Sequence, residues 1–146
     1  MATRVQFYHN AEHPLALACE FAARAFSDGR KVALRVADEA MARELDRLLW
    51  NFDPLEFVPH VMVDSPLAAE TPVVIGRADT PLRWPETDVL LNLADDIPEG
   101  FERFRMLVEI VGQSEAQKLP ARARWKHYKQ QDLRLQAFDA VRREAL

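Results

Sequence analysis

The sequence predicts an α/β fold, a three-layer arrangement in which helices cover both faces of a mostly parallel sheet. The predicted elements begin in the order β-α-β-α, and residues 73–76 and 88–93 are later, nearly continuous apolar runs. Such runs are typical of strands that are covered on both faces. With 146 residues, 49% of them hydrophobic, the chain is expected to form one domain, residues 1–146.

The first predicted strand and helix lie within residues 4–28. Residues 4–8 alternate in hydrophobicity and include aromatic and β-branched side chains, which indicates a strand. Residues 13–28 carry apolar side chains at helical spacing. Pro14 suits the first turn of this helix, and Gly29 stands where a helix commonly stops.

The second strand and helix follow directly. Residues 31–36 read as a strand, and Asp38 is a suitable N-cap for a helix that ends near Trp50. The next segment, residues 51–72, contains several prolines and is predicted to be irregular.

The C-terminal part is predicted to add a last buried strand and a terminal helix. Residues 104–111 form the strand, and Ser114 can cap the helix. Pro120 removes a helical hydrogen bond, so we expect the helix to start at Leu119 or to kink there. A further amphipathic piece, residues 133–141, closes the chain.

The sequence lacks the motifs that bind nucleotides, cofactors and metals. The first strand is followed by Tyr8–Ala11 without a glycine, so we expect no nucleotide-binding glycine loop and no cofactor. The four histidines are not spaced as metal ligands, so no metal site is expected. The single cysteine, Cys19, lies on the apolar stripe of the first helix and is expected to be an inert core residue.

Two further expectations concern location and chemistry. No apolar run approaches the ~20 residues of a membrane span, and the N-terminus lacks a secretory signal, so we expect a cytoplasmic protein without a membrane partner. An alternative function is a small nucleotide-binding enzyme that uses strand ends; its candidate residues are His9, Asn10, Asp88, Asn92 and Asp95. Turn chemistry is the better interpretation of the last three, because no partner base or phosphate loop accompanies them.

The segment Lys118–Lys129 contains five Lys or Arg residues, a Trp and a Tyr, on a chain whose net charge is −4. In a helix, Lys118, Arg122, Trp125 and Lys129 share one face. This face is either a solvated helix surface with its Trp packed inward or a docking site for an acidic peptide with an apolar end. The acidic chain argues against strong direct DNA binding, so DNA is expected to be reached only indirectly.

Five sequence strings together resemble the chi subunit of bacterial DNA polymerase III holoenzyme. The strings are LDRLLW (residues 45–50), FVPH (57–60), DVLLNL (88–93), FRMLVEIV (104–111) and RARWKHYK (122–129). The resemblance runs from the first strand to about Lys129, and the C-terminal extension, residues 132–146, matches poorly.

This resemblance implies a non-catalytic accessory subunit of a DNA polymerase complex. The family has a Rossmann-like fold without nucleotide binding. It binds the acidic, Phe-terminated C-terminal tail of single-stranded-DNA-binding protein and pairs with the psi subunit, which links it to the clamp loader. The psi-binding surface cannot be transferred residue by residue.

The resemblance also implies where the tail binds. The tail-binding positions of the family fall on Phe57, Val111, Lys118, Arg122 and Trp125. Arg122 is expected to pair with the acidic groups or the terminal carboxylate of the tail, while Phe57, Val111 and Trp125 line an apolar pocket. The remaining residue of the predicted helical face, Lys129, is included in the candidate site.

Overall fold

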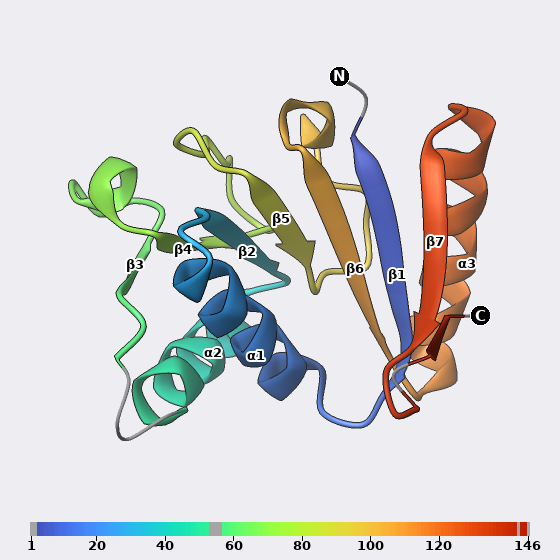
Figure 1. The fold of residues 1–146 in the computed structure, drawn as a ribbon, viewed down its shortest axis with the longest axis horizontal. Helices are drawn as coiled ribbons and strands as arrows, with labels where there is room; N and C mark the ends of the chain where they lie inside the picture. The colour runs from blue at the N-terminus through green and yellow to red at the C-terminus, as the bar shows by residue number, and fades with distance from the viewer. Residues whose placement is uncertain (1–2, 53–56, 143, 146) are drawn as a thin grey trace.

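The structure is a computed structural model that describes residues 3–52, 57–142 and 144–145. One eight-stranded sheet runs through the molecule in the order β3-β4-β2-β5-β6-β1-β7-β8 (Figure 1). Seven strands are parallel, and β8 pairs antiparallel with β7. The strands are β1 (Arg4–Ala11), β2 (Val32–Val36), β3 (His60–Met62), β4 (Val73–Arg77), β5 (Val89–Asn92), β6 (Met106–Gly112), β7 (Arg134–Asp139) and β8 (Glu144–Ala145).

Helices cover both faces of this sheet. Helices α1 (Pro14–Ser27) and α2 (Glu39–Asn51) pack on one face, and α3 (Glu115–Gln130) packs on the other over β6, β1 and β7. Short 3-10 helices span Ala68–Glu70 and Phe101–Arg103. The predicted α/β fold with a mostly parallel, doubly covered sheet is therefore confirmed.

The alternation of side chains along the strands divides the core in two. On β2, Val32 and Leu34 pack with α1 and α2, whereas Ala33 belongs to the core beneath α3. Because successive side chains of a strand point to opposite faces, a strand covered on both sides must be apolar at nearly every position. This requirement explains the continuous apolar runs in the sequence.

Local signals set several element ends. The Asp38 side chain accepts a hydrogen bond of 3.0 Å from the backbone N–H of Met41, so the predicted N-cap of α2 is confirmed. Ser114 occupies the N-cap position of α3, where its backbone carbonyl accepts hydrogen bonds from Gln117 and Lys118 while its side chain makes no cap bond.

The C-terminal part differs from the prediction in two respects. Helix α3 starts at Glu115, directly after the predicted cap residue Ser114, and continues through Pro120, so a start at Leu119 is wrong. Proline is tolerated because the carbonyl it leaves without a helical donor belongs to Ala116, an exposed residue that water can reach. The second difference is that residues 104–111 do not hold the last strand: within the predicted amphipathic piece, Arg134–Asp139 forms β7, which pairs with β1.

The predicted irregular segment, residues 51–72, contains the short strand β3 and a 3-10 helix, and residues 53–56 lie outside the described part of the chain. Among the residues that the structure describes, no helix has the length and apolar character needed to cross a membrane.

Cys19 is buried in α1, and burial raises the pKa of its thiol to about 12. The thiolate is the reactive form of cysteine, so the native protein should resist thiol reagents at neutral pH. We expect no modification by a maleimide until the chain is unfolded in denaturant, as measured by mass spectrometry. Modification of the native protein as fast as that of the denatured chain would contradict the buried placement.

Candidate functional site

Helix α3 turns one flank to solvent and the other to the sheet. Ala121, Arg124 and Tyr128 are buried against the sheet, whereas Arg122 and Lys129 are exposed. Lys118 and Trp125, both partly buried, lie on the same flank as Arg122 and Lys129, as the helical spacing predicts. We call these four residues, Lys118, Arg122, Trp125 and Lys129, the basic-aromatic face.

The aromatic part of this face rests on strand β1. The ring of Trp125 meets the ring of Phe7 edge-on, with centroids 5.2 Å apart, and lies 6.4 Å from the imidazole of His9. Burial lowers the pKa of His9, and the negative charge of Asp139 offsets part of this shift. A neutral imidazole is therefore favoured beside Trp125 at neutral pH, which makes this end of the face apolar.

The cations of the face lack a counter-charge among the residues that the structure describes. Within the described part of the chain, Lys118, Arg122 and Lys129 form no ion pair and no side-chain hydrogen bond. No Asp or Glu occurs from residue 116 to residue 131 of the sequence. The face therefore presents three uncompensated positive charges next to a half-buried indole ring.

The structure does not bring Phe57 to this face. Phe57 precedes the edge strand β3, and its ring lies 4.9 Å from that of Trp50 and 6.1 Å from that of His60. Four strands separate β3 from β1, on which Trp125 rests, a span of roughly 24 Å at the usual strand spacing. The predicted pocket shared by Phe57 and Trp125 therefore does not form.

Val111 lies near the basic-aromatic face but beneath α3. It is 2% exposed and packs in the same core cluster as Ala121 and Tyr128. Its side chain supports the helix from below and does not line an open pocket in this structure.

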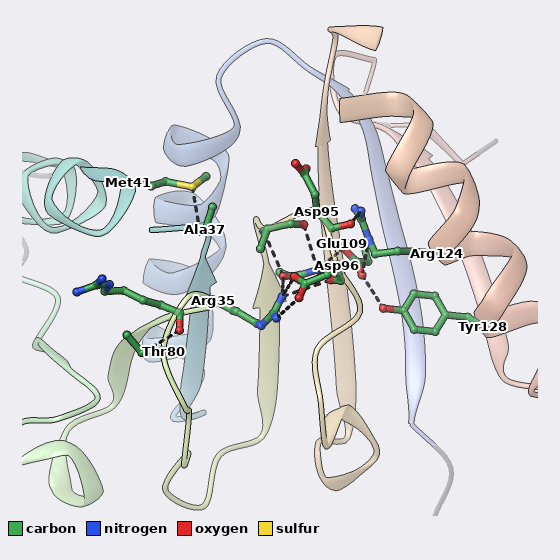
Figure 2. A network of polar contacts seen from close by, with 12 residues as sticks. Arg35, Ala37, Met41, Thr80, Asp95, Asp96, Glu109, Arg124 and Tyr128 are labelled. Atoms are coloured by element: carbon green, nitrogen blue, oxygen red, sulfur yellow. Dashed lines mark hydrogen bonds and ion pairs between the residues drawn. The ribbon is translucent and has the colours of Figure 1, made fainter. Parts of the chain in front are cut away.

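A buried polar network fastens α3 to the sheet (Figure 2). At its centre is Glu109 of β6, a fully buried carboxylate. The Tyr128 hydroxyl donates a hydrogen bond of 2.6 Å to Oε2 of Glu109, and Nε of Arg124 lies 3.1 Å from the same oxygen. That N–H is not aligned for a hydrogen bond, so the contact is an ion pair only. Arg124 also donates a bond of 2.6 Å from Nη1 to the carbonyl of Asp95.

Burial and the neighbouring polar groups shift the pKa of Glu109 in opposite directions. Burial raises the pKa of Glu109, while the charge of Arg124 and the hydrogen bonds from Tyr128 and Asn92 lower it. Burial, together with the adjacent Glu109, also raises the pKa of Tyr128, which keeps its hydroxyl protonated as a donor. The network therefore depends on all of its partners being present.

The same network continues along the carboxyl ends of the central strands. Asn92 donates a hydrogen bond of 2.9 Å to Glu109 and accepts one of 3.0 Å from Arg35. The guanidinium of Arg35 binds both carboxylate oxygens of Asp96, at 2.8 and 3.0 Å. This is the edge where Rossmann-like sheets bind nucleotides. Here the polar groups of Arg35, Asn92 and Glu109 are engaged with each other, so little is left there for a ligand.

The other enzyme candidates do not gather into a site. Asp88 accepts a hydrogen bond from the backbone N–H of Lys31, a loop contact at the opposite end of β5 from Asn92. Asn10 lies within β1, where the pairing with β6 shifts register between Tyr8 and Ala11, and has a positive φ of 64°. Among the described residues, no group of three or more His, Cys, Asp or Glu side chains is arranged to hold a metal ion.

A second exposed surface lies on the α1–α2 side of the sheet. It consists of Trp50 and Phe57, which are 58% and 53% exposed and have ring centroids 4.9 Å apart, together with Phe26 at the end of α1, which lines a hollow with Phe57. We call these three residues the aromatic patch. Large aromatic side chains exposed together on a small domain are typical of a protein–protein contact surface.

Sequence reasoning missed the buried network. One signal was available: Glu109 interrupts the apolar run of β6, and a carboxylate in a covered strand requires a buried partner. Ala121, Arg124 and Tyr128 lie on one flank of α3 by their helical spacing. The sequence does not show that this flank faces the sheet until the strands beneath α3 are known.

Comparison with known proteins identifies the family. The sequence model described as DNA polymerase III chi subunit, HolC, matches residues 2–136. This chain belongs to the DNA polymerase III chi subunit family. Curated members include the DNA polymerase III subunit chi of Haemophilus influenzae, which is 34% identical over 95% of both chains.

Two other chi subunits are similar to this chain over most of their lengths. The chi subunit of Pseudomonas aeruginosa is 34% identical over 92% of this chain and 94% of its own. The chi subunit of Escherichia coli is 32% identical over 77% of this chain and 76% of its own. The resemblance that the sequence strings indicate is therefore confirmed, and the C-terminal ten residues lie outside the family match.

Proposed function

We propose that this chi-family chain is a non-catalytic adaptor of the cytoplasmic replication machinery. In this proposal it holds the acidic C-terminal tail of single-stranded-DNA-binding protein on the basic-aromatic face, and the psi subunit links it to the clamp loader. The observation that carries the proposal is the combination of uncompensated cations with the half-buried ring of Trp125 on one flank of α3.

The chemistry of the face matches that of the tail. The tail has acidic side chains, a terminal carboxylate and a terminal Phe. Arg122 can meet a carboxylate with two parallel hydrogen bonds, and Lys118 and Lys129 add positive charge on either side. Trp125 and the neutral His9 supply an apolar wall for the Phe ring. Val111 contributes by supporting α3 from beneath.

The aromatic patch provides a separate surface for psi. It lies on the face of the sheet opposite α3, so a partner bound there leaves the basic-aromatic face free. An adaptor must hold its two partners at once, and two surfaces on opposite faces meet that need. We assign Phe57 to this second surface rather than to the tail site.

The Arg122→Ala variant tests the tail site. We expect it to lose about 1–3 kcal/mol of affinity for a peptide of the tail, because one charged hydrogen-bonding partner is removed. Titration calorimetry measures the affinity, and wild-type binding should weaken as salt is added.

Two control variants sharpen this experiment. Arg43→Ala removes an exposed arginine from α2, and Phe57→Ala truncates the aromatic patch. Both should bind the tail peptide as wild type does. If Arg122→Ala also binds with wild-type affinity, the assignment of the tail to this face is wrong.

A further inference from the structure

A second cationic surface lies at the amino ends of the central strands. Five arginines line a groove of about 580 Å³ there: Arg4, Arg30, Arg103, Arg105 and Arg134. We call it the arginine groove. Among the described residues that line it, Glu102 alone is acidic. Such a concentration of positive charge is unexpected on a chain whose net charge is −4.

The groove lies at the amino-terminal edge of the sheet, and Arg4 and Met106 line it from the sheet face opposite α3. Side chains alternate along β1, and Val5 and Phe7 point into the core beneath α3. Arg4 therefore points to the α1 side, as does Met106, its partner on β6, which packs against the α1–α2 core. The arginine groove and the basic-aromatic face are thus distinct surfaces.

The backbone holds the arginines near one another. Arg4 and Arg134 are direct cross-strand partners of β1 and β7, so their side chains leave the same face of the sheet. The backbone N–H of Arg4 donates a hydrogen bond of 3.0 Å to the carbonyl of Arg105. Thr3 adds a hydroxyl bond of 2.7 Å to the carbonyl of Phe104, which fixes the same edge.

These five positive charges repel one another, and the single acidic residue of the described lining, Glu102, is not within ion-pair distance of any of them. Like charges directly opposite on neighbouring strands are destabilising. None of the five groove arginines forms an ion pair with any residue in the described part of the chain. Three other surface arginines do find partners: Arg43, Arg47 and Arg77 pair with Glu39, Glu44 and Asp79, respectively. An anionic ligand would relieve the repulsion in the groove.

We propose that the arginine groove binds the phosphate backbone of single-stranded nucleic acid. Guanidinium groups match phosphate oxygens with paired hydrogen bonds. Arginines contributed by four separate segments suit a ligand with repeated anionic groups rather than one isolated anion. The volume of the groove, about 580 Å³, is enough for a short stretch of one strand.

Binding of nucleic acid by the arginine groove would add to the adaptor function but does not require it. The negative net charge makes the affinity of the free chain weak. A chain tethered to single-stranded-DNA-binding protein meets DNA at a high effective concentration, and a weak interaction is then sufficient. The groove should bind nucleic acid whether or not the tail site functions.

Anisotropy of a labelled oligothymidylate of about 20 nucleotides tests the proposal at low salt. We expect saturable binding by the full chain. The Arg4→Gln/Arg134→Gln variant should bind about tenfold more weakly. Its slope of log affinity against log salt should be shallower by about 1.4, or 0.7 for each phosphate that an arginine no longer neutralises.

The matched control is Arg43→Gln/Arg47→Gln, which removes the same charge from exposed arginines that already have partners. It should retain the wild-type slope. Equal losses in the two variants would show that only net charge matters and would overturn the proposal, as would the absence of binding by the wild type. Tighter binding of oligoglutamate than of oligothymidylate would identify an acidic peptide as the ligand instead.

Two measurements separate this test from that of the tail site. Arg122→Ala should lose the tail peptide while it retains the oligonucleotide. The thermal midpoint of Arg4→Gln/Arg134→Gln should be no lower than that of the wild type, because the substitutions remove a repulsion. Unchanged oligonucleotide binding in this folded variant, with binding abolished in Arg122→Ala, would move the DNA site to α3 and refute the groove.

Discussion

The Arg124→Met variant is expected to lose about 3–5 kcal/mol of its free energy of unfolding, because it leaves the Glu109 carboxylate buried without its cation. Glu109 and Arg124 are 0% and 4% exposed, so water cannot replace the missing partner. Urea denaturation measures the change. Arg43→Met is the matched control; it breaks an exposed pair with Glu39 and should cost less than about 1 kcal/mol.

The dependence of this loss on pH distinguishes an uncompensated charge from lost packing. Burial already raises the pKa of Glu109, and without Arg124 this shift increases. A raised pKa in the folded state gives stability at low pH that is lost as the pH rises through that pKa. Arg124→Met should therefore be less destabilised at about pH 5 than at about pH 8.

The Arg124→Met/Glu109→Gln double variant should not show this extra pH dependence, because it lacks the titrating group. All other titrating groups are shared by the two variants and cancel in the comparison. An equally strong pH dependence in both would mean that Glu109 is not its source.

Phe7→Ala is expected to destabilise the protein by about 3–5 kcal/mol, the range for deleting a buried aromatic ring. The ring is fully buried and meets those of Trp125 and Tyr128 edge-on, with centroids 5.2 and 5.9 Å away. Phe7 therefore supports both the buried network and the aromatic part of the proposed tail site. The free energy of unfolding from urea denaturation tests the size of the loss.

Phe7→Leu separates support of the site from general stability. It retains most of the apolar volume, so it should fold, yet Trp125 loses the ring on which it rests. We expect several-fold weaker binding of the tail peptide. Leu34→Ala is the control, because Leu34 is fully buried in the core on the other sheet face. It should cost about 2–5 kcal/mol without weakening the tail in the folded protein. Wild-type affinity in Phe7→Leu would exclude a supporting role.

The strands that can be recognised from the sequence are those that are covered by helices on both sides. Strands β2, β4 and β5 are buried at nearly every position, so their apolar runs are continuous. Strand β7 differs because its burial alternates between exposed and partly buried residues. Its pairing with β1 joins residues about 130 positions apart, as in Arg4 and Arg134, and no local pattern can specify such a pairing.

The same distinction holds for the candidate site: features set by neighbouring residues can be predicted from the sequence, and features set by distant residues cannot. The flank that carries Arg122 and Trp125 follows from helical spacing, which is local, and the structure retains it. The position of Phe57 depends on where β3 joins the sheet, which spacing cannot reveal. The partners of Glu109 come from β5 and α3, so its role emerges only when these elements are assembled.

The position of β1 has a consequence for synthesis of the chain. The first strand lies between β6 and β7, both from the last third of the sequence. At about 5–20 residues per second, a ribosome needs roughly 5–20 s to make the hundred or so residues that precede β6. Until then, β1 emerges with both hydrogen-bonding edges unpaired, a state prone to association with other nascent chains. The centre of the sheet can therefore form only late in synthesis or after it, once β6 and β7 have left the ribosome.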